Sequence, residues 1–161
     1  AGRAGGARPG RPHLLFLCQG NICRSSYAEH KARQLFAELR IDASVESAGM
    51  LPRNPRPAPP HAQEASAARG IDLSGHRSQH AHREVIERAS WIVVFDEINY
   101  RACLQRYPEA ASRLVYLAQF EGRPEPTPIA DPEGRTTTFF STTYERIDRC
   151  LSGLAEQLRT C

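Results

Sequence analysis

The chain has 161 residues, of which 40% are hydrophobic and 24% are charged. These values are close to the average for a soluble globular domain, so they exclude a disordered chain, a collagen-like repeat and a small disulfide scaffold. The formal net charge of +3 comes from Arg3, Arg8 and Arg11, because the remaining basic and acidic residues are equal in number. We therefore expect no nucleic-acid-binding surface.

The apolar runs and the number of cysteines indicate where in the cell the protein is expected. No apolar run approaches the roughly 20 residues that span a bilayer, and the first residues lack the apolar core of a signal peptide, so we expect no membrane insertion. The five cysteines are an odd number, which favours free thiols in a reducing compartment over a disulfide framework. These features predict a cytoplasmic protein.

The chain divides into a predicted flexible tail, residues 1–12, rich in Gly, Arg and Pro, and one folded domain, residues 13–161. Alternating or continuous apolar runs predict strands at residues 13–17, 43–48, 91–95 and 113–117. Helical spacing of apolar residues predicts helices at residues 25–40, 62–69, 79–90 and 100–107, and a terminal helix with the stripe Tyr144, Ile147, Leu151, Leu154 and Leu158. Prolines predict long loops at residues 49–60 and 122–134.

Strands that alternate with helices indicate an α/β fold. We predict a single domain with a central four-stranded parallel sheet and helices on both faces. The unbroken apolar run of residues 91–95 is typical of a strand inside the sheet. Ligands bind such sheets at the carboxyl ends of the strands, and residues 18–25 occupy that position after the first strand. We therefore expect the functional loop there.

This segment combines a cysteine, a glycine and an arginine at a strand-to-helix turn. Free N–H groups at a helix N-terminus bind a phosphate dianion, and the same field favours a thiolate at Cys18 over a thiol. Arg24, six residues further on, has a planar fork that donates two hydrogen bonds to phosphoryl oxygens. Gly20 permits backbone conformations that other residues resist. The pattern predicts a phosphate-binding loop with a nucleophilic cysteine.

The string Cys-x-Gly-Asn-Ile-Cys-Arg-Ser resembles the phosphate-binding loop of the low-molecular-weight protein tyrosine phosphatases. The resemblance extends to Ser47-Ala48-Gly49 after the second strand, to Gly70-Ile71-Asp72-Leu73-Ser74-Gly75-His76, and to Asp131-Pro132 before the last helix. It implies that residues 13–161 are a catalytic domain of this kind. The implied activity is hydrolysis of phosphotyrosine in protein substrates, without a cofactor or metal, with inorganic phosphate or vanadate as inhibitors.

The resemblance also implies a two-step mechanism with named residues. Cys18 attacks phosphorus and Asp131 protonates the leaving oxygen; water then hydrolyses the cysteinyl-phosphate with Asp131 as base. Arg24 binds the phosphoryl oxygens in the transition state. The remaining members of the implied loop are Gln19, Gly20, Asn21, Ile22, Cys23 and Ser25, where Ser25 stabilises the sulfur as it leaves and Asn21 and His76 hold the loop in shape.

The sequence departs from the family pattern at the substrate rim. Ser26 stands where the family often has proline, which affects only the entry to the helix. Glu133 follows Asp-Pro where the family typically has an aromatic residue, and the loop after the second strand also lacks one. The rim is therefore predicted to contain Leu51, Arg53 and Glu133, with Arg53 or Arg56 available to acidic residues of a target.

Several site residues have simpler explanations that stay open. Ser25 fits a helix N-cap equally well, and His76 fits a packing or surface position. Asp131 could instead form an Asx-type turn before Pro132; the other candidate acid, Asp96, is expected to cap the helix that follows it. Cys23 lies close enough for a protective disulfide with Cys18 on oxidation, or is a small packing residue.

Other cysteines and histidines are assigned no role in the chemistry. Cys103 and Cys150 lie on apolar helix faces, so we expect core thiols, and Cys161 ends the chain. His76, His80 and His82 lack a recognised metal-ligand spacing.

Three rival functions remain. A thioredoxin-coupled arsenate reductase shares the loop but needs two relay cysteines beyond the third strand, where only Cys103 lies near. A protein-arginine phosphatase has threonine in place of Ile22. A silent phosphopeptide-binding module has no need of Cys18, Arg24 and Asp131 together.

Overall fold

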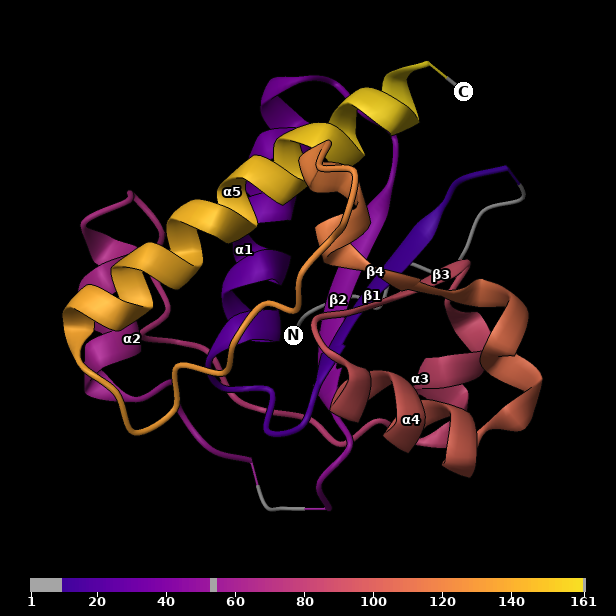
Figure 1. The fold of residues 1–161 in the computed structure, drawn as a ribbon, viewed down its shortest axis with the longest axis horizontal. Coiled ribbons are helices and arrows are strands. Elements are labelled where there is room, and N and C mark those ends of the chain that lie inside the picture. The colour runs from indigo at the N-terminus through magenta and orange to yellow at the C-terminus, as the bar shows by residue number, and fades with distance from the viewer. Residues whose placement is uncertain (1–9, 53–54, 161) are drawn as a thin grey trace.

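The computed structural model describes residues 10–52 and 55–160 (Figure 1). The predictions for residues 1–9, Arg53 and Cys161 lie outside these ranges. The strands are β1 (His13–Cys18), β2 (Ser44–Gly49), β3 (Trp91–Val94) and β4 (Leu114–Tyr116). The α-helices are α1 (Arg24–Glu38), α2 (Pro60–Ala67), α3 (Arg83–Arg88), α4 (Glu97–Arg106) and α5 (Thr137–Arg159), and two 3-10 helices span Pro108–Arg113 and Leu117–Glu121.

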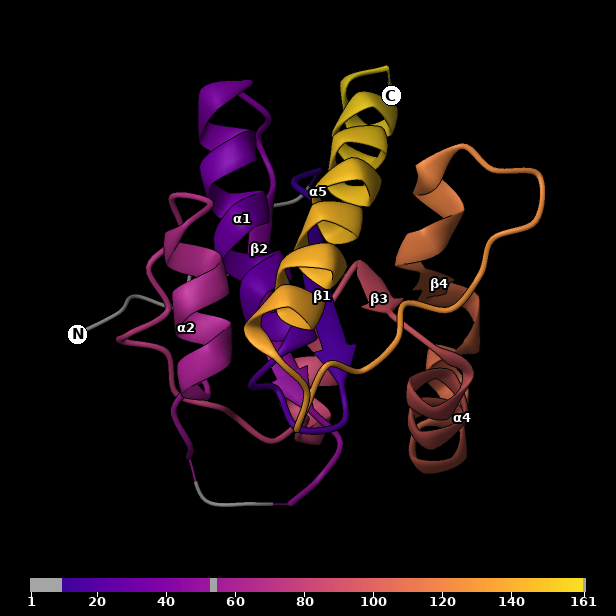
Figure 2. The same ribbon diagram turned by 60° about the vertical axis from the view of Figure 1, so that its left-hand side comes forward.

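The four strands form one parallel sheet in the order β2-β1-β3-β4. This confirms the predicted α/β fold and the inner position of the third strand. Side chains of a strand alternate between faces: Leu14 and Phe16 of β1 join the core under α1, α2 and α5, whereas Leu15 and Leu17 join the core under α3 and α4. Figure 2 shows these helix layers on opposite sides of the strands.

The carboxyl ends of β1, β2 and β3 meet at one edge. Cys18 pairs with Gly49 in the register of β1 and β2, and Leu17 pairs with both Ala48 and Val94. The segments that leave these strands therefore start side by side, and they carry Cys18, Met50 and Asp96.

The predicted helix over residues 79–90 is wrong at its start, because only Arg83–Arg88 is helical. Residues 79–81 run alongside the end of β2: Gly49 N–H donates to the Gln79 carbonyl, and Ala81 N–H donates to the Gly49 carbonyl. These backbone groups are used by the sheet edge and are unavailable to a helix. The fourth strand is also shorter than predicted, because 3-10 helices flank it on both sides.

Residues 1–12 were predicted to be a flexible tail, and the structure describes only residues 10–12 of this segment. At its end, Arg11 forms an ion pair with Asp42 at 2.9 Å, and Pro12 accepts a backbone hydrogen bond from Ser44. The boundary between tail and domain stays a prediction.

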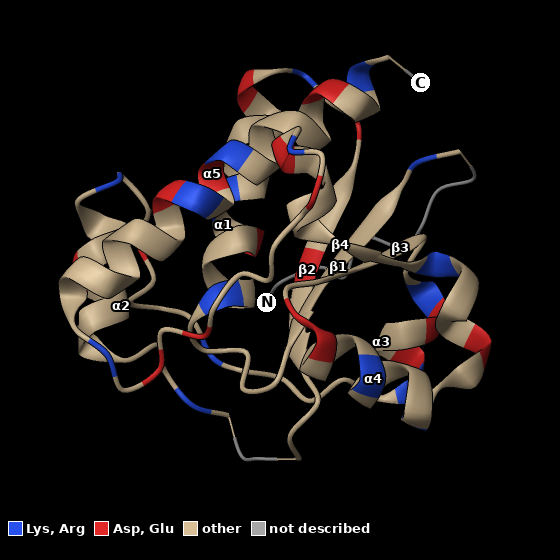
Figure 3. Cartoon of the chain, viewed as in Figure 1, with Lys and Arg blue, Asp and Glu red and all other residues tan. Residues whose placement is uncertain are grey.

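Charges of both signs are interspersed along the helices (Figure 3), and i,i+4 pairs such as Arg101 with Glu97 and Arg149 with Glu145 join them. Among the described residues, no helix has the length and apolar character needed to cross a membrane.

Candidate active site

The loop between β1 and α1 wraps around the sulfur of Cys18. The Asn21 backbone N–H donates to Sγ at 3.3 Å, and the hydroxyl of Ser25 lies 3.0 Å from it. Asn21 Nδ2 donates to the Ser25 oxygen at 2.9 Å, so the serine proton is free to point at the sulfur. Cys18 is buried to 4% exposure, and the loop offers two donors that can stabilise negative charge on its sulfur during a reaction.

Ser25 is not the N-cap of α1. The N-cap position is occupied by Cys23, which provides no side-chain cap, and Ser25 lies inside the first turn. The alternative reading of Ser25 as a helix cap is therefore wrong, because its hydroxyl is engaged by Cys18 and Asn21.

Asn21 holds the loop through every polar group it has. Its backbone is left-handed, with φ of 56°, a conformation that asparagine tolerates better than most residues. Its side-chain amide donates also to Ser47 Oγ at 2.8 Å and accepts from Gln79 N–H at 2.9 Å. Its carbonyl oxygen lies 2.7 Å from His76 Nε2. These contacts place the predicted pair Asn21 and His76 together at the loop.

The loop also lies against the end of β2. Met50 N–H donates to the Cys18 carbonyl and Leu51 N–H to the Gln19 carbonyl, each at 3.0 Å. A Cβ at Gly49 would lie 2.7 Å from the Gln19 oxygen. Glycine is required at position 49 by this close approach of two backbones.

Arg24 is almost fully buried and is fixed on one side. Its NH1 donates to Asp96 Oδ2 and to the Ile129 carbonyl, each at 2.7 Å, and its guanidinium lies over the Phe95 ring, 5.5 Å from the centroid. Within the described ranges, Nε of Arg24 has no hydrogen-bond partner. A buried guanidinium N–H without a partner is costly, so this donor is available to an anion in the loop.

Asp131 faces Arg24 from the long loop before α5. Its Oδ2 lies 3.8 Å from Arg24 NH2, and its side chain is 44% exposed. Its Oδ1 accepts from Glu133 N–H at 3.1 Å, so the Asx-type turn considered from the sequence is present as well. The two features use different oxygens and are compatible.

Asp96 confirms its predicted capping role and adds another. Oδ1 accepts from Asn99 N–H at 2.8 Å at the N-terminus of α4, while Oδ2 pairs with Arg24. The sequence reasoning missed this pairing, although both residues follow neighbouring strands of the sheet. Gln79 was missed in the same way, whereas Ser47 is part of the resemblance but was given no role in holding Asn21.

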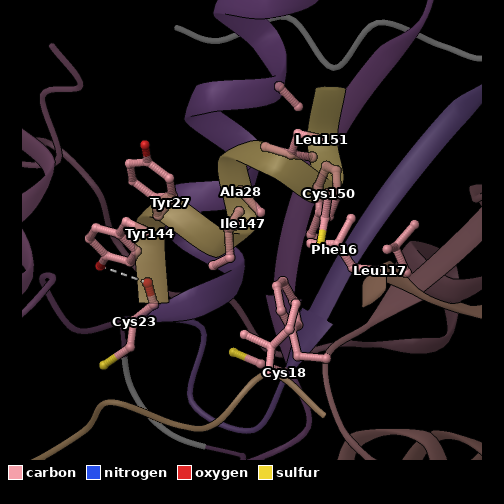
Figure 4. Packing of buried hydrophobic residues seen from close by; sticks show 14 of the residues in the cluster. Phe16, Cys18, Cys23, Tyr27, Ala28, Leu117, Tyr144, Ile147, Cys150 and Leu151 are labelled. Atoms are coloured by element: carbon pink, nitrogen blue, oxygen red, sulfur yellow. Dashed lines mark hydrogen bonds between the residues drawn. The ribbon is translucent and has the colours of Figure 1, made fainter. Parts of the chain in front are cut away.

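The two loop cysteines differ in surroundings. Burial, and next the negative charge of Asp131, raise the pKa of Cys23 well above the usual range of a thiol. Tyr144 of α5 donates its hydroxyl to the Cys23 carbonyl at 2.9 Å and stacks on Tyr27, as Figure 4 shows. Cys23 is thus a neutral, packed thiol, and the predicted disulfide with Cys18 stays a prediction, since both are free thiols here.

Cys18, Gly20, Asn21, Ile22, Cys23, Arg24, Asp131 and Glu133 line one cavity of only about 10 Å³. Leu51 lies beside the loop, and Arg56 reaches it, with NH2 3.4 Å from where a Cβ of Gly20 would stand. Arg53 lies in the undescribed segment.

Cys103 and Cys150 are completely buried, which confirms them as core thiols. Burial raises the pKa of each to about 11. Cys103 is therefore neither accessible nor ionised, as a redox relay thiol would need to be.

A strand-loop-helix phosphate cradle with a cysteine beneath it defines a class of phosphatases, and comparison with known proteins gives the same class. The family model for the low molecular weight phosphotyrosine protein phosphatases matches residues 13–160. The chain is 34% identical over 146 residues to EpsP of Ralstonia nicotianae, named a probable low molecular weight protein-tyrosine-phosphatase, and this alignment covers 91% of the chain and 95% of EpsP.

Two solved structures are similar over their whole length. The YwlE arginine phosphatase of Geobacillus stearothermophilus has a TM-score of 0.84 at 28% identity, covering 92% of this chain and 94% of its own. Wzb of Vibrio vulnificus, in complex with benzylphosphonate, has a TM-score of 0.82 at 26% identity, covering 92% and 99%. The chain belongs to the low molecular weight phosphotyrosine protein phosphatase family, whose members are hydrolases.

Proposed function

We propose that the protein hydrolyses phosphotyrosine monoesters of protein substrates through a phosphorylated Cys18. The observation that carries this proposal is the cavity itself, which Cys18, Arg24 and Asp131 line together. Arg24 is buried there with an unpartnered Nε–H, and the Asp131 side chain is partly exposed. Nucleophile, anion donor and proton donor are the three groups that transfer of a phosphoryl group to a side chain needs.

In the first step the Cys18 thiolate attacks phosphorus and the bond from phosphorus to the phenol oxygen breaks. Protonated Asp131 gives its proton to that oxygen, so tyrosine leaves as a neutral phenol. Arg24 Nε and the loop N–H groups bind the phosphoryl oxygens, and Asp96 keeps the other edge of the guanidinium in place.

In the second step water attacks phosphorus and the phosphorus–sulfur bond breaks. The Asp131 carboxylate accepts a proton from the water, which returns the acid for the next cycle. The Ser25 hydroxyl, 3.0 Å from Sγ, stabilises the departing thiolate. The products are inorganic phosphate and the starting Cys18 thiolate.

Phosphotyrosine is proposed as the substrate because the family model and EpsP carry that name. A phosphoarginine substrate is the second candidate, since YwlE is named an arginine phosphatase. Ile22, which lines the cavity, argues against it, because the resemblance implies threonine at this position in arginine phosphatases. Leu51, Arg53 and Glu133 are proposed as the rim. The thioredoxin-coupled reductase is not favoured, because Cys103 is sealed in the core.

Phosphate and vanadate are proposed as competitive inhibitors, and the benzylphosphonate complex of Wzb supports binding of phosphate analogues in this fold. A cytoplasmic location is proposed from the free thiols of Cys18, Cys23, Cys103 and Cys150.

The proposal is tested by turnover of phosphotyrosine, phosphoserine and phosphoarginine peptides of one sequence, with chelator present. We expect turnover of the phosphotyrosine peptide, competitive inhibition by vanadate, and no turnover in Cys18→Ser. Cys103→Ser is the matched control, since it removes a buried thiol remote from the cavity, and it should retain activity. Preference for the phosphoarginine peptide would show that phosphoarginine, and not phosphotyrosine, is the substrate. Activity in Cys18→Ser would overturn the mechanism.

A further inference from the structure

Glu29, His30 and His76 form a second cluster of side chains beside the phosphate loop. Within the described residues they are the one group of three metal-binding side chains whose ligand atoms lie within 4.8 Å of one another. Glu29 and His30 come from α1, and His76 comes from the segment between α2 and α3. The histidines compared in the sequence, His76, His80 and His82, do not meet: His80 and His82 pair with each other, and His76 lies edge-on to His30.

We propose that Glu29, His30 and His76 form a binding site for a single zinc-type divalent cation. Two imidazoles and a carboxylate are a zinc ligand set, with water completing a tetrahedron. Ligand atoms around zinc lie roughly 3.4 Å apart, so small rotations of the half-buried Glu29 and His30 bring the group to that spacing. The site goes beyond the proposed function and does not depend on it.

His76 has one ring nitrogen engaged at the phosphate loop. Its Nε2 lies 2.7 Å from the Asn21 carbonyl oxygen, which can only accept, so Nε2 carries the proton and donates it. The tautomer leaves a lone pair on Nδ1, for which the described residues provide no hydrogen-bond partner. A histidine that donates one ring N–H to a carbonyl and binds metal with the other nitrogen is the usual arrangement at protein metal sites.

The carboxylate of Glu29 can exchange its present cation for a metal ion. Glu29 Oε2 already pairs with a cation, the Arg33 guanidinium, at 2.6 Å. The Arg33 side chain is 52% exposed, so a metal ion can take its place while Arg33 moves into water.

The cluster is accessible from solvent. It lies in a cleft of about 310 Å³, lined also by Glu46, Ser47, Gly75, Arg77 and Gln79. The charged groups that face it are Glu46 and Asp72 of negative sign and Arg33 and Arg77 of positive sign. A bound cation would face this nearly balanced set and would compensate the charge of Glu29.

The test is zinc titration of the full chain carrying Cys18→Ser, so that the loop thiol cannot bind the metal. Zinc is competed against a chromophoric chelator, and we expect one site per chain. His30→Ala and Glu29→Gln should each weaken the site by about tenfold or more. The matched control is the double substitution His80→Ala and His82→Ala, which removes the other close pair of imidazoles and should leave the affinity unchanged.

A second measurement does not depend on stable variants. Nitrogen chemical shifts of the histidine rings should show His76 protonated on Nε2 without metal, and zinc should shift Nδ1 of His76 and a nitrogen of His30. Absence of zinc binding, binding unaffected by His30→Ala, or loss of binding in the His80 and His82 control would overturn the site. Its failure would leave the turnover test of Cys18 untouched.

Discussion

Asp96 and Asp131 are two carboxylates on opposite sides of one guanidinium, and their surroundings give them different tasks. Asp96 is 17% exposed and has both oxygens engaged, by Asn99 and by Arg24. Asp131 is 44% exposed and keeps Oδ2 toward the cavity. The fixed carboxylate suits a counterion that positions Arg24, whereas the exposed one can meet a leaving group.

Replacement of Asp131 should affect substrates according to their leaving groups. A tyrosine phenolate has a pKa of about 10, so the proton donor should contribute on the order of 100- to 10,000-fold. A nitrophenolate needs far less help. Asp131→Ala should slow a phosphotyrosine peptide much more than nitrophenyl phosphate, and the pH–rate profile should lose the limb that reports the protonated acid.

Asp131→Asn is the sharper variant, because asparagine keeps an oxygen for the turn to Glu133 N–H but cannot give a proton. It should behave like Asp131→Ala on the peptide. Equal losses on the two substrates, or a mild effect of Asp131→Asn, would contradict the acid role and point to Asp96.

At the scale of elements, Glu46 of β2 ties together parts of the chain that are far apart in sequence. It accepts from Arg88 Nε at the end of α3 at 2.7 Å and from Gln79 Nε2 at 3.0 Å, and it pairs with His13 of β1. Burial alone would raise the pKa of Glu46, but the hydrogen bonds from Arg88, His13 and Gln79 outweigh it and lower the pKa to about 2.

A carboxyl group whose pKa is lower in the folded than in the unfolded state stabilises the fold at pH values above its unfolded-state pKa. This stabilisation is lost as the pH falls through its folded-state pKa. Glu46 should therefore contribute on the order of 3 kcal/mol above about pH 4.5, decreasing toward pH 2. Glu46→Gln should lower the urea midpoint at pH 6, and its difference from wild type should shrink between these pH values. Glu156→Gln, at an exposed position of α5, should show neither effect. A difference that is constant with pH would refute the assignment.

The elements also show what the sequence could predict. Apolar periodicity predicted the four strands and the inner place of Trp91–Val94, because a strand that is buried on both faces has a continuous run of apolar residues. It failed over residues 79–82, where hydrogen bonds to Gly49 decide the conformation. Such bonds depend on a partner some thirty residues away, and no local pattern records them.

At the scale of the whole molecule, the sheet brings distant segments to one edge. The loop string and its resemblance predicted Cys18, Arg24, Asn21, His76 and Asp131, and the structure places them together. The partners Asp96 and Gln79 carry no motif of their own, so only the strand order β2-β1-β3 shows that they meet the loop. The proximity of Glu29, His30 and His76 arises in the same way, because segments that are distant in sequence meet beside the loop.

The most direct test of the role of Cys18 is to trap the phosphorylated enzyme. The full chain is mixed with a radiolabelled phosphotyrosine peptide, quenched rapidly and digested, with Cys18→Ser as the control. The cysteinyl-phosphate mechanism predicts label on the peptide that contains Cys18, formed and lost at least as fast as the steady-state turnover, and none in the control. Label on another residue, or turnover without a labelled Cys18, would contradict it.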